Sequence, residues 1–191
     1  MTPKGREART TPRYTWEKHG PIVVASTLSS ANEQTRLLVH RHIHELLHEF
    51  SLPLKVSSTP LDEADLQLVR QLAASSTVGS LLDGDRFEEQ LGETRAKGRL
   101  LQGLVVLLDP GKYERVHFEG EANQQALYGY SVSDGLCLLL NYDAAPVRHE
   151  VSHMLGLEAH CQNTACVMHY KCPRPGRFCD SCKMTLIDLW H

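Results

Sequence analysis

The sequence has no apolar run that approaches the length of a membrane span, and it has no excess of basic charge. A transmembrane helix needs about 20 consecutive apolar residues, and the apolar stretches here are much shorter. The 20 Lys and Arg residues are outnumbered by 23 Asp and Glu residues, which gives a formal net charge of -3. Nucleic-acid-binding domains usually carry a basic surface. We therefore expect neither a membrane nor a nucleic-acid partner.

The N-terminal residues lack the apolar segment of a secretory signal. Residues 1–16 contain four basic side chains and no apolar h-region. We expect residues 1–19 to be a flexible polar tail and the protein to be cytoplasmic, a location in which stable disulfides are disfavoured.

The rest of the chain has the composition of one soluble domain. A chain of 191 residues with 41% hydrophobic content can bury a substantial core, and no internal repeat is present. Hydrophobic periodicity predicts four buried or half-buried strands, over Pro21–Thr27, Lys55–Ser58, Leu100–Leu108 and Leu136–Leu140. It predicts helices over Asn32–Phe50, Asp62–Ala74 and Phe87–Leu91, and an exposed edge strand over Val116–Glu119. This alternation indicates an α/β fold.

A helix that follows the last of these strands carries two histidines four residues apart. His149 and His153 therefore share one helix face and can bind a single metal ion. Glu150 lies beside that face, where its carboxylate can take a proton from a zinc-bound water. Gly156 can adopt a positive φ and end the helix, which brings His160 back as a third ligand. The alternative, a solvated polar helix face, does not account for the glycine and the third histidine.

A second set of potential metal ligands begins at the next residue. Cys161 and Cys166 form a CxxxxC pair, and Cys179 and Cys182 form a CxxC pair. Four thiolates suit a closed, tetrahedral, structural zinc site, and the alternative is free or disulfide-bonded cysteines. Nearby basic residues either offset the charge of this site or are simply solvated: Lys171, Arg174, Arg177 and Lys183.

This segment resembles the archaemetzincin family of metallopeptidases, whose signature is HExxHxxGxxHC, four residues, CxM, a spacer and CxxC. The matching residues are His149, Glu150, His153, Gly156, His160, Cys161, Cys166, Met168, Cys179 and Cys182. The resemblance implies a single compact metzincin-like domain over residues 20–191, with a mixed twisted sheet above the active-site helix. Residues 20–156 would form its upper α/β part, and residues 157–191 a small lower part stapled by zinc.

The resemblance also implies individual roles. Met168 would form the Met-turn beneath the catalytic zinc, and Tyr170 would hydrogen-bond the developing oxyanion or merely pack at the surface. The chain departs from the family pattern by one extra residue before His160 and by a shorter spacer before Cys179. Cys172 in that spacer is an additional thiol, either spare or able to replace one of the four ligands.

These observations predict a monomeric zinc metallopeptidase that holds two Zn²⁺ ions, one catalytic and one structural. A peptide or protein substrate would pair with the edge strand Val116–Glu119, and Glu150 would activate the zinc-bound water. The alternative is a non-catalytic two-zinc module that mediates protein or nucleic-acid interaction. A stripe of histidines on the first helix, His40, His44 and His48, is more typical of a solvated surface than of a metal site.

Overall fold

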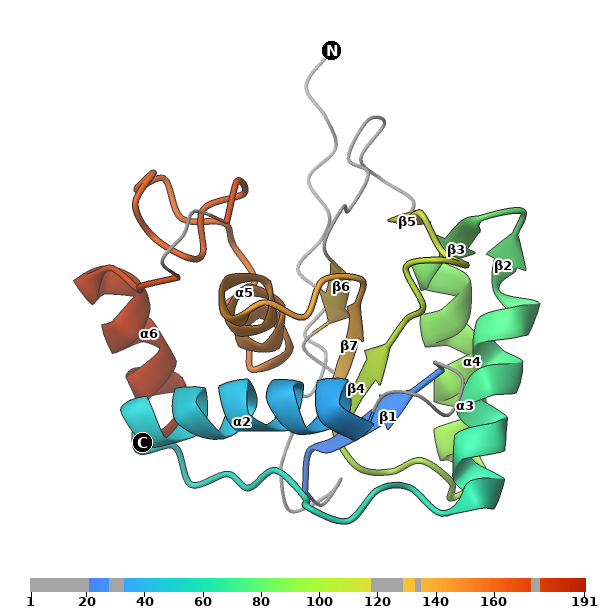
Figure 1. Ribbon diagram of the computed structural model, residues 1–191. Helices are drawn as coiled ribbons and strands as arrows, with labels where there is room; N and C mark the ends of the chain where they lie inside the picture. Colours follow the sequence, from blue (N-terminus) through green and yellow to red (C-terminus); the bar gives the residue numbers. More distant parts are fainter. Residues whose placement is uncertain (1–20, 28–32, 118–128, 133–134, 173–175) are drawn as a thin grey trace.

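The computed structural model describes residues 21–27, 33–117, 129–132, 135–172 and 176–191. In these residues the chain forms two β-sheets and five helices (Figure 1). The α/β class and the mixed sheet are therefore confirmed. The polar tail expected over residues 1–19 lies outside the described residues.

The larger sheet is mixed and has four strands. Its order is β1 (Val23–Ser26), β4 (Leu104–Leu107), β7 (Leu136–Leu139) and β6 (Gly129–Val132). The first three strands are parallel to one another, and β6 pairs antiparallel with β7. The connection from β1 to β4 contains helices, as is usual between parallel strands, whereas the described part of the connection from β4 to β7 contains the strands β5 (Arg115–His117) and β6. Strand β6 therefore forms one edge of this sheet.

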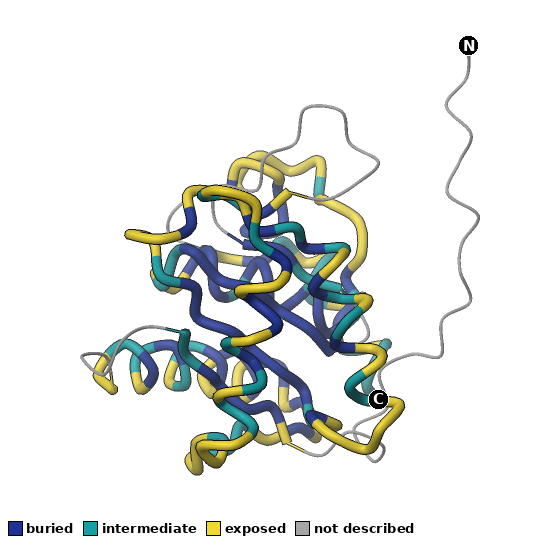
Figure 2. The backbone as a smooth tube through the Cα atoms, turned by 90° about the vertical axis from the view of Figure 1, so that its right-hand side faces the viewer, coloured by how far each residue is buried: buried dark blue, intermediate teal, exposed yellow. Residues whose placement is uncertain are grey.

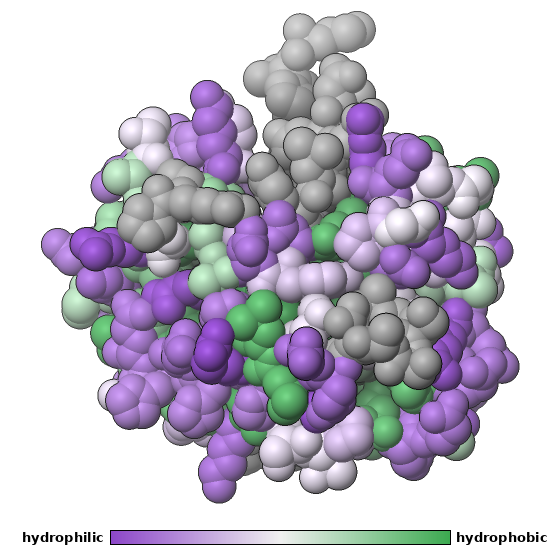
Figure 3. Space-filling view, viewed as in Figure 1, coloured by the Kyte–Doolittle hydropathy of each residue, from purple (hydrophilic) through white to green (hydrophobic). Residues whose placement is uncertain are grey.

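Both faces of the sheet are buried, because its central strands are apolar at every position. On β4, Val105 and Leu107 belong to the core on one face, and Leu104 and Val106 belong to the core on the other face. Figure 2 shows these central segments in dark blue, surrounded by exposed loops. The face in Figure 3 is mainly hydrophilic, with small hydrophobic areas between the polar ones.

Helices cover the two faces in pairs. Helices α2 (Glu33–Glu49) and α5 (Ala144–Met154) pack on one face, and α3 (Glu63–Ser75) and α4 (Gly84–Ala96) pack on the other face (Figure 1). None of the helices in the described part of the chain is both long and apolar enough to span a membrane.

The end of α5 follows a Schellman pattern at Gly156. This glycine has a φ of +106°, its N–H donates to the carbonyl of His153 at 2.9 Å, and the N–H of Leu157 donates to the carbonyl of Ser152 at 2.9 Å. The prediction that Gly156 ends the motif helix with a positive φ is confirmed.

The predicted exposed edge strand over Val116–Glu119 is confirmed in part where the structure describes it: β5 is an edge strand, but of a second, smaller sheet, and its central residue is buried. Residues Arg115–His117 form β5, which pairs in parallel with β3 (Leu81–Asp83) in a separate sheet completed by β2 (Thr77–Val78). Val116 is fully buried in the core beneath α3 and α4. A short β-branched segment suits a buried strand as well as an exposed one, and packing decides between them. The edge strand beside α5 is β6.

Several other predicted boundaries need correction. Lys55–Ser58 contributes only one bridge, between Val56 and Ile22, because the Ser57 hydroxyl accepts a hydrogen bond from the N–H of Thr59 and turns the chain. The short helix predicted over Phe87–Leu91 belongs to the longer α4, whose N-terminus is capped by Asp83. Helix α6 (Asp180–Trp190) was not predicted at all.

Candidate metal centres

Helix α5 places two imidazoles at the spacing of metal ligands. The Nε2 atoms of His149 and His153 lie 3.1 Å apart. Two nitrogens bound to a tetrahedral zinc at 2.0–2.1 Å are separated by about 3.3 Å. The pair therefore fits a shared metal ion with little adjustment.

Backbone carbonyls fix the orientation of both rings. The Nδ1 atoms of His149 and His153 lie 2.6 and 2.5 Å from the carbonyl oxygens of Val167 and Leu157. A carbonyl can only accept a hydrogen bond, so each Nδ1 is the protonated nitrogen and each Nε2 keeps a lone pair. Metal-binding histidines usually have such a second partner.

His160 completes a three-histidine cluster despite the extra residue before it. The candidate ligand atoms of His149, His153 and His160 all lie within 4.8 Å of one another. The ring of His160 lies 5.3 Å from that of His149 and 5.0 Å from that of His153, measured between centroids. The extra residue is absorbed in the turn after Gly156, where no helical hydrogen bonds have to be broken. His160 is exposed, so the cluster opens toward solvent on its side.

Burial keeps the two helical histidines neutral. Burial, together with smaller contributions from the neighbouring imidazoles, lowers the pKa of His149 to about 4 and the pKa of His153 to about 3. Neutral imidazole is the form that binds a metal. Neither ring therefore has to lose a proton when a metal binds at neutral pH.

The carboxyl of Glu150 lies in a dry environment against strand β6. Glu150 is only 8% exposed, and burial raises its pKa to about 7. A Cβ atom placed on Gly129 would come within 2.9 Å of Glu150 Cγ and 2.4 Å of the carbonyl oxygen of Leu138. Only glycine lets β6 lie directly on the glutamate. This contact is not apparent from the sequence, because β6 was not predicted.

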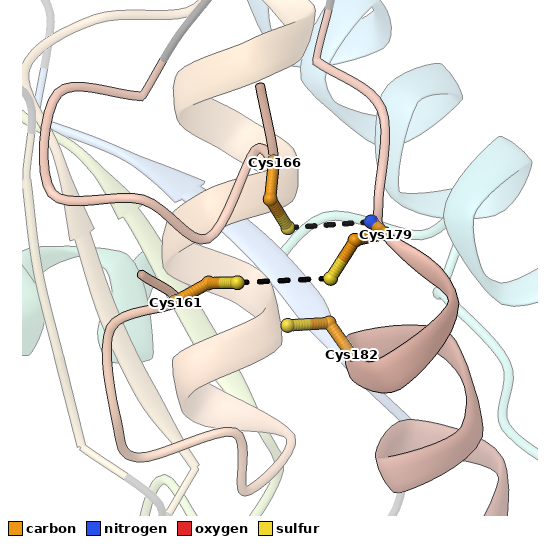
Figure 4. Close-up of side chains that lie close together, drawn as sticks. All are labelled: Cys161, Cys166, Cys179 and Cys182. Carbon is orange, nitrogen blue, oxygen red and sulfur yellow. Dashed lines mark hydrogen bonds between the residues drawn. The ribbon is translucent and has the colours of Figure 1, made fainter. Parts of the chain in front are cut away.

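The four cysteines of the second motif form another cluster (Figure 4). Cys161 and Cys166 lie in the loop after α5, Cys179 is the N-cap of α6, and Cys182 lies in the first turn of α6. The Sγ atoms of Cys161 and Cys179 are 3.6 Å apart. This distance is too long for a disulfide, and it is close to the value of about 3.8 Å for two thiolates on a tetrahedral zinc.

The start of α6 favours a thiolate at Cys179. Its pKa is lowered to about 7, mainly by a hydrogen bond from the backbone N–H of Cys182. The backbone N–H of Cys179 in turn donates to the sulfur of Cys166 at 3.4 Å. Hydrogen bonds of this kind stabilise the deprotonated sulfurs that a zinc ion needs.

The two clusters are connected through Val167. Its carbonyl orients His149, and its N–H donates to the carbonyl of Arg177 at 2.7 Å, two residues before Cys179. The N–H of Cys161 donates to the carbonyl of Met168 at 2.8 Å. The loop that holds the cysteines therefore also holds a histidine of the other cluster.

The remaining described residues that were singled out from the sequence belong to neither cluster. Met168 is fully buried, whereas Tyr170 is 61% exposed; its ring contacts the ring of His169, and the Lys171 ammonium lies 5.5 Å from its centroid. Cys172 is buried but belongs to neither cluster. Among the described residues, the histidine stripe of α2 forms no cluster of metal ligands.

Two of the four basic residues near the cysteines, Lys171 and Arg177, are exposed, and Lys183 is half-buried. Arg174 lies outside the described residues.

One histidine near the site was not singled out from the sequence. His169 is buried, its Nδ1 accepts a hydrogen bond from the N–H of Lys171 at 3.2 Å, and its proximity lowers the pKa of His149. Its only signal in the sequence is its position directly after Met168.

No protein-family model matches this chain, and no curated protein matches it either. The evidence on function is therefore the geometry of the two clusters and of the residues packed against them.

Proposed function

We propose that this chain is a zinc-dependent metallopeptidase of the archaemetzincin type, with one catalytic and one structural zinc ion. The observation that supports the proposal is the combination of a carboxylate and two imidazoles on α5. A buried carboxylate, Glu150, lies next in sequence to a pair of oriented imidazoles that the third histidine completes. A purely structural zinc site has no use for that carboxylate, which is costly to bury.

His149, His153 and His160 would hold the catalytic ion, and the four cysteines would hold the structural ion. Three neutral imidazoles leave a fourth position open, as in catalytic sites, whereas four thiolates close the second site. When bound, the catalytic zinc supplies a Lewis acid that polarises the scissile carbonyl and lowers the pKa of water to about 7.

Glu150 would act as general base and then as general acid. A carboxyl whose pKa lies near 7 can accept a proton from the attacking water and donate it to the leaving amine. Its dry environment against β6 favours this proton transfer, because a solvated carboxylate with a pKa near 4.5 is a poor acid at neutral pH.

Strand β6 would bind the substrate. It pairs with β7 on one side and is an edge of the described sheet on the other, so an extended peptide can add to it through backbone hydrogen bonds. Because Gly129 touches Glu150, a peptide on this edge would lie close to the proton-transferring group. The arrangement of the mixed sheet over the motif helix supports a metzincin-like fold.

The decisive experiment compares Glu150→Gln with Glu158→Gln. Glu158 is an exposed glutamate in the turn between Gly156 and His160, so its variant controls for the loss of one charge near the site. Zinc content and cleavage of a peptide library are measured for both variants and for the wild type. We expect Glu150→Gln to keep both metals and to lose at least about 100-fold in kcat, whereas Glu158→Gln cleaves like the wild type.

Either of two results would reject the proposal. One is a wild-type protein that holds two zinc ions but cleaves nothing across a broad library, which favours the non-catalytic two-zinc module. The other is a Glu150→Gln variant that retains full peptidase activity.

A further inference from the structure

Strand β6 presents two neighbouring small residues to Glu150. Residues 129 and 131 are two apart on one strand, so they share a face of the sheet. Gly129 approaches Glu150 so closely that a Cβ atom would lie 3.2 Å from its carboxyl carbon. The next residue on the same face is Ser131, which brings a hydroxyl toward the same side of the strand.

The hydroxyl of Ser131 is enclosed in the protein without a hydrogen bond of good geometry. Its Oγ atom is inaccessible to solvent and has no aligned partner. A buried polar group left in this state costs about 1–3 kcal/mol, so its retention calls for a compensating contact. Ser131 lies on the face of β6 on which Gly129 approaches Glu150, and in agreement with this position it lowers the pKa of that carboxyl.

The neighbouring strand β7 places a buried residue beside Ser131. Ser131 pairs directly with Cys137 on β7, and cross-strand partners have adjacent side chains. Cys137 is fully buried. Burial raises the pKa of its thiol well above the usual range, and the charge of Glu150 raises it further. Its thiol is a weak donor that does not compete with a hydroxyl for the carboxylate.

We propose that Ser131 is a positioning residue for Glu150. Its rotatable hydroxyl donates a hydrogen bond to one carboxylate oxygen and leaves the other oxygen free to take a proton from water. Gly129 lets the strand approach closely enough for this contact, and Cys137 keeps it dry. The catalytic consequence rests on the proposed peptidase function, but the contact itself does not.

The first arm of the test measures catalysis in Ser131→Ala, Ser131→Thr and Ser152→Ala. Ser152 is a buried serine on α5 whose hydroxyl donates to the carbonyl of Arg148, so its variant controls for the loss of a buried hydroxyl. We expect Ser131→Ala to lower kcat about 10-fold or more, as the loss of a supporting hydrogen bond does, with KM and zinc content unchanged. Ser131→Thr, which keeps the hydroxyl, should restore most of kcat, and Ser152→Ala should leave it unchanged.

The second arm needs no activity. The urea midpoint of the zinc-loaded protein is measured for Ser131→Ala, Glu150→Ala and the double variant. If the hydroxyl contacts the carboxylate, Ser131→Ala lowers the midpoint in the wild type but much less when Glu150 is already replaced. Equal shifts in the two backgrounds would overturn the positioning role.

The two arms separate the failure of this inference from the failure of the proposed function. Unequal midpoint shifts in a protein without peptidase activity support the Ser131–Glu150 contact and reject the peptidase. Peptidase activity that Ser131→Ala leaves intact rejects the positioning role and leaves the peptidase standing.

Discussion

Replacing Glu150 by Gln should stabilise the protein at alkaline pH once the metal of the three-histidine site has been removed. In that state no cation compensates the buried carboxylate, which is only 8% exposed. Glutamine has nearly the same shape and carries no charge at any pH. The difference between the two proteins therefore isolates the free energy of ionising Glu150 in its dry environment.

The sign and size follow from the shift in pKa. The pKa of Glu150 is about 7 in the folded protein and 4.5 without the protein environment. Between these values the folded state binds more protons than the unfolded state, so the free energy of unfolding falls as pH rises from 4.5 to 7. At about 1.4 kcal/mol per unit of pKa, the loss reaches about 3 kcal/mol and is complete above pH 7. The Glu150→Gln variant should not show it.

The two helical histidines act in the opposite direction. Their pKa values are about 4 and about 3 in the folded protein, below the usual 6.5, so the unfolded state binds more protons and stability rises with pH up to about 6.5. Because His149 and His153 are present in both proteins, their contribution cancels to a first approximation when the wild type is compared with Glu150→Gln.

Urea unfolding of the two proteins at pH 5 and pH 8, after mild chelation that leaves the thiolate zinc in place, measures the difference. We expect Glu150→Gln to gain about 2–3 kcal/mol relative to the wild type between these two pH values. A difference between the two proteins that is the same at pH 5 and pH 8 would refute the reasoning, because it would mean that the carboxylate is solvated in the folded state.

Three further predictions concern the metal centres. The purified protein should hold two zinc ions, of which mild chelation removes one, because a closed thiolate site exchanges its metal more slowly than an open one; metal analysis before and after chelation would show this. Cys179→Ser should lose the slowly exchanging zinc. It should also weaken binding of the labile zinc by about 10-fold or more in a zinc titration, because the cysteine loop carries the Val167 carbonyl that orients His149. An unchanged affinity for the labile zinc would mean that the two sites are independent. His160→Ala should weaken binding of the labile zinc sharply, whereas Ala159→Gly should bind it like the wild type, and equal affinities in these two variants would remove His160 from the ligand set.

The motif helix could be predicted because its geometry is local. The four-residue spacing of His149 and His153 fixes their common face in any α-helix, and Gly156 ends the helix because a glycine adopts the positive φ of the Schellman pattern without strain. These features depend on residues within about ten positions of one another. No knowledge of the tertiary structure was needed to place them.

The sequence predicts that the four cysteines bind one metal ion, but it does not predict where in the fold they meet. The spacing of Cys161, Cys166, Cys179 and Cys182 indicates tetrahedral ligation, but their meeting point depends on how α6 packs. That helix has few signals of its own in the sequence, and it is held by contacts such as the hydrogen bond from Trp190 Nε1 to the carbonyl of Leu155 at 3.1 Å. Such distant pairings cannot be derived from local propensity.

Strand β6 could not be predicted for a physical reason that also explains its role. Tyr130 and Val132 favour a strand, but Gly129 is a poor strand former and the alternation is only four residues long, so the segment has a weak strand signal. Gly129 is required because the strand lies directly on the glutamate of the neighbouring helix, where a larger side chain would meet both Glu150 and the Leu138 carbonyl. The more regular pattern at Val116 is a signal of core packing, since that residue is fully buried beneath α3 and α4. The weak signal of the edge that we propose binds the substrate is therefore due in part to Gly129, because closeness to Glu150 excludes a larger, strand-favouring side chain at that position.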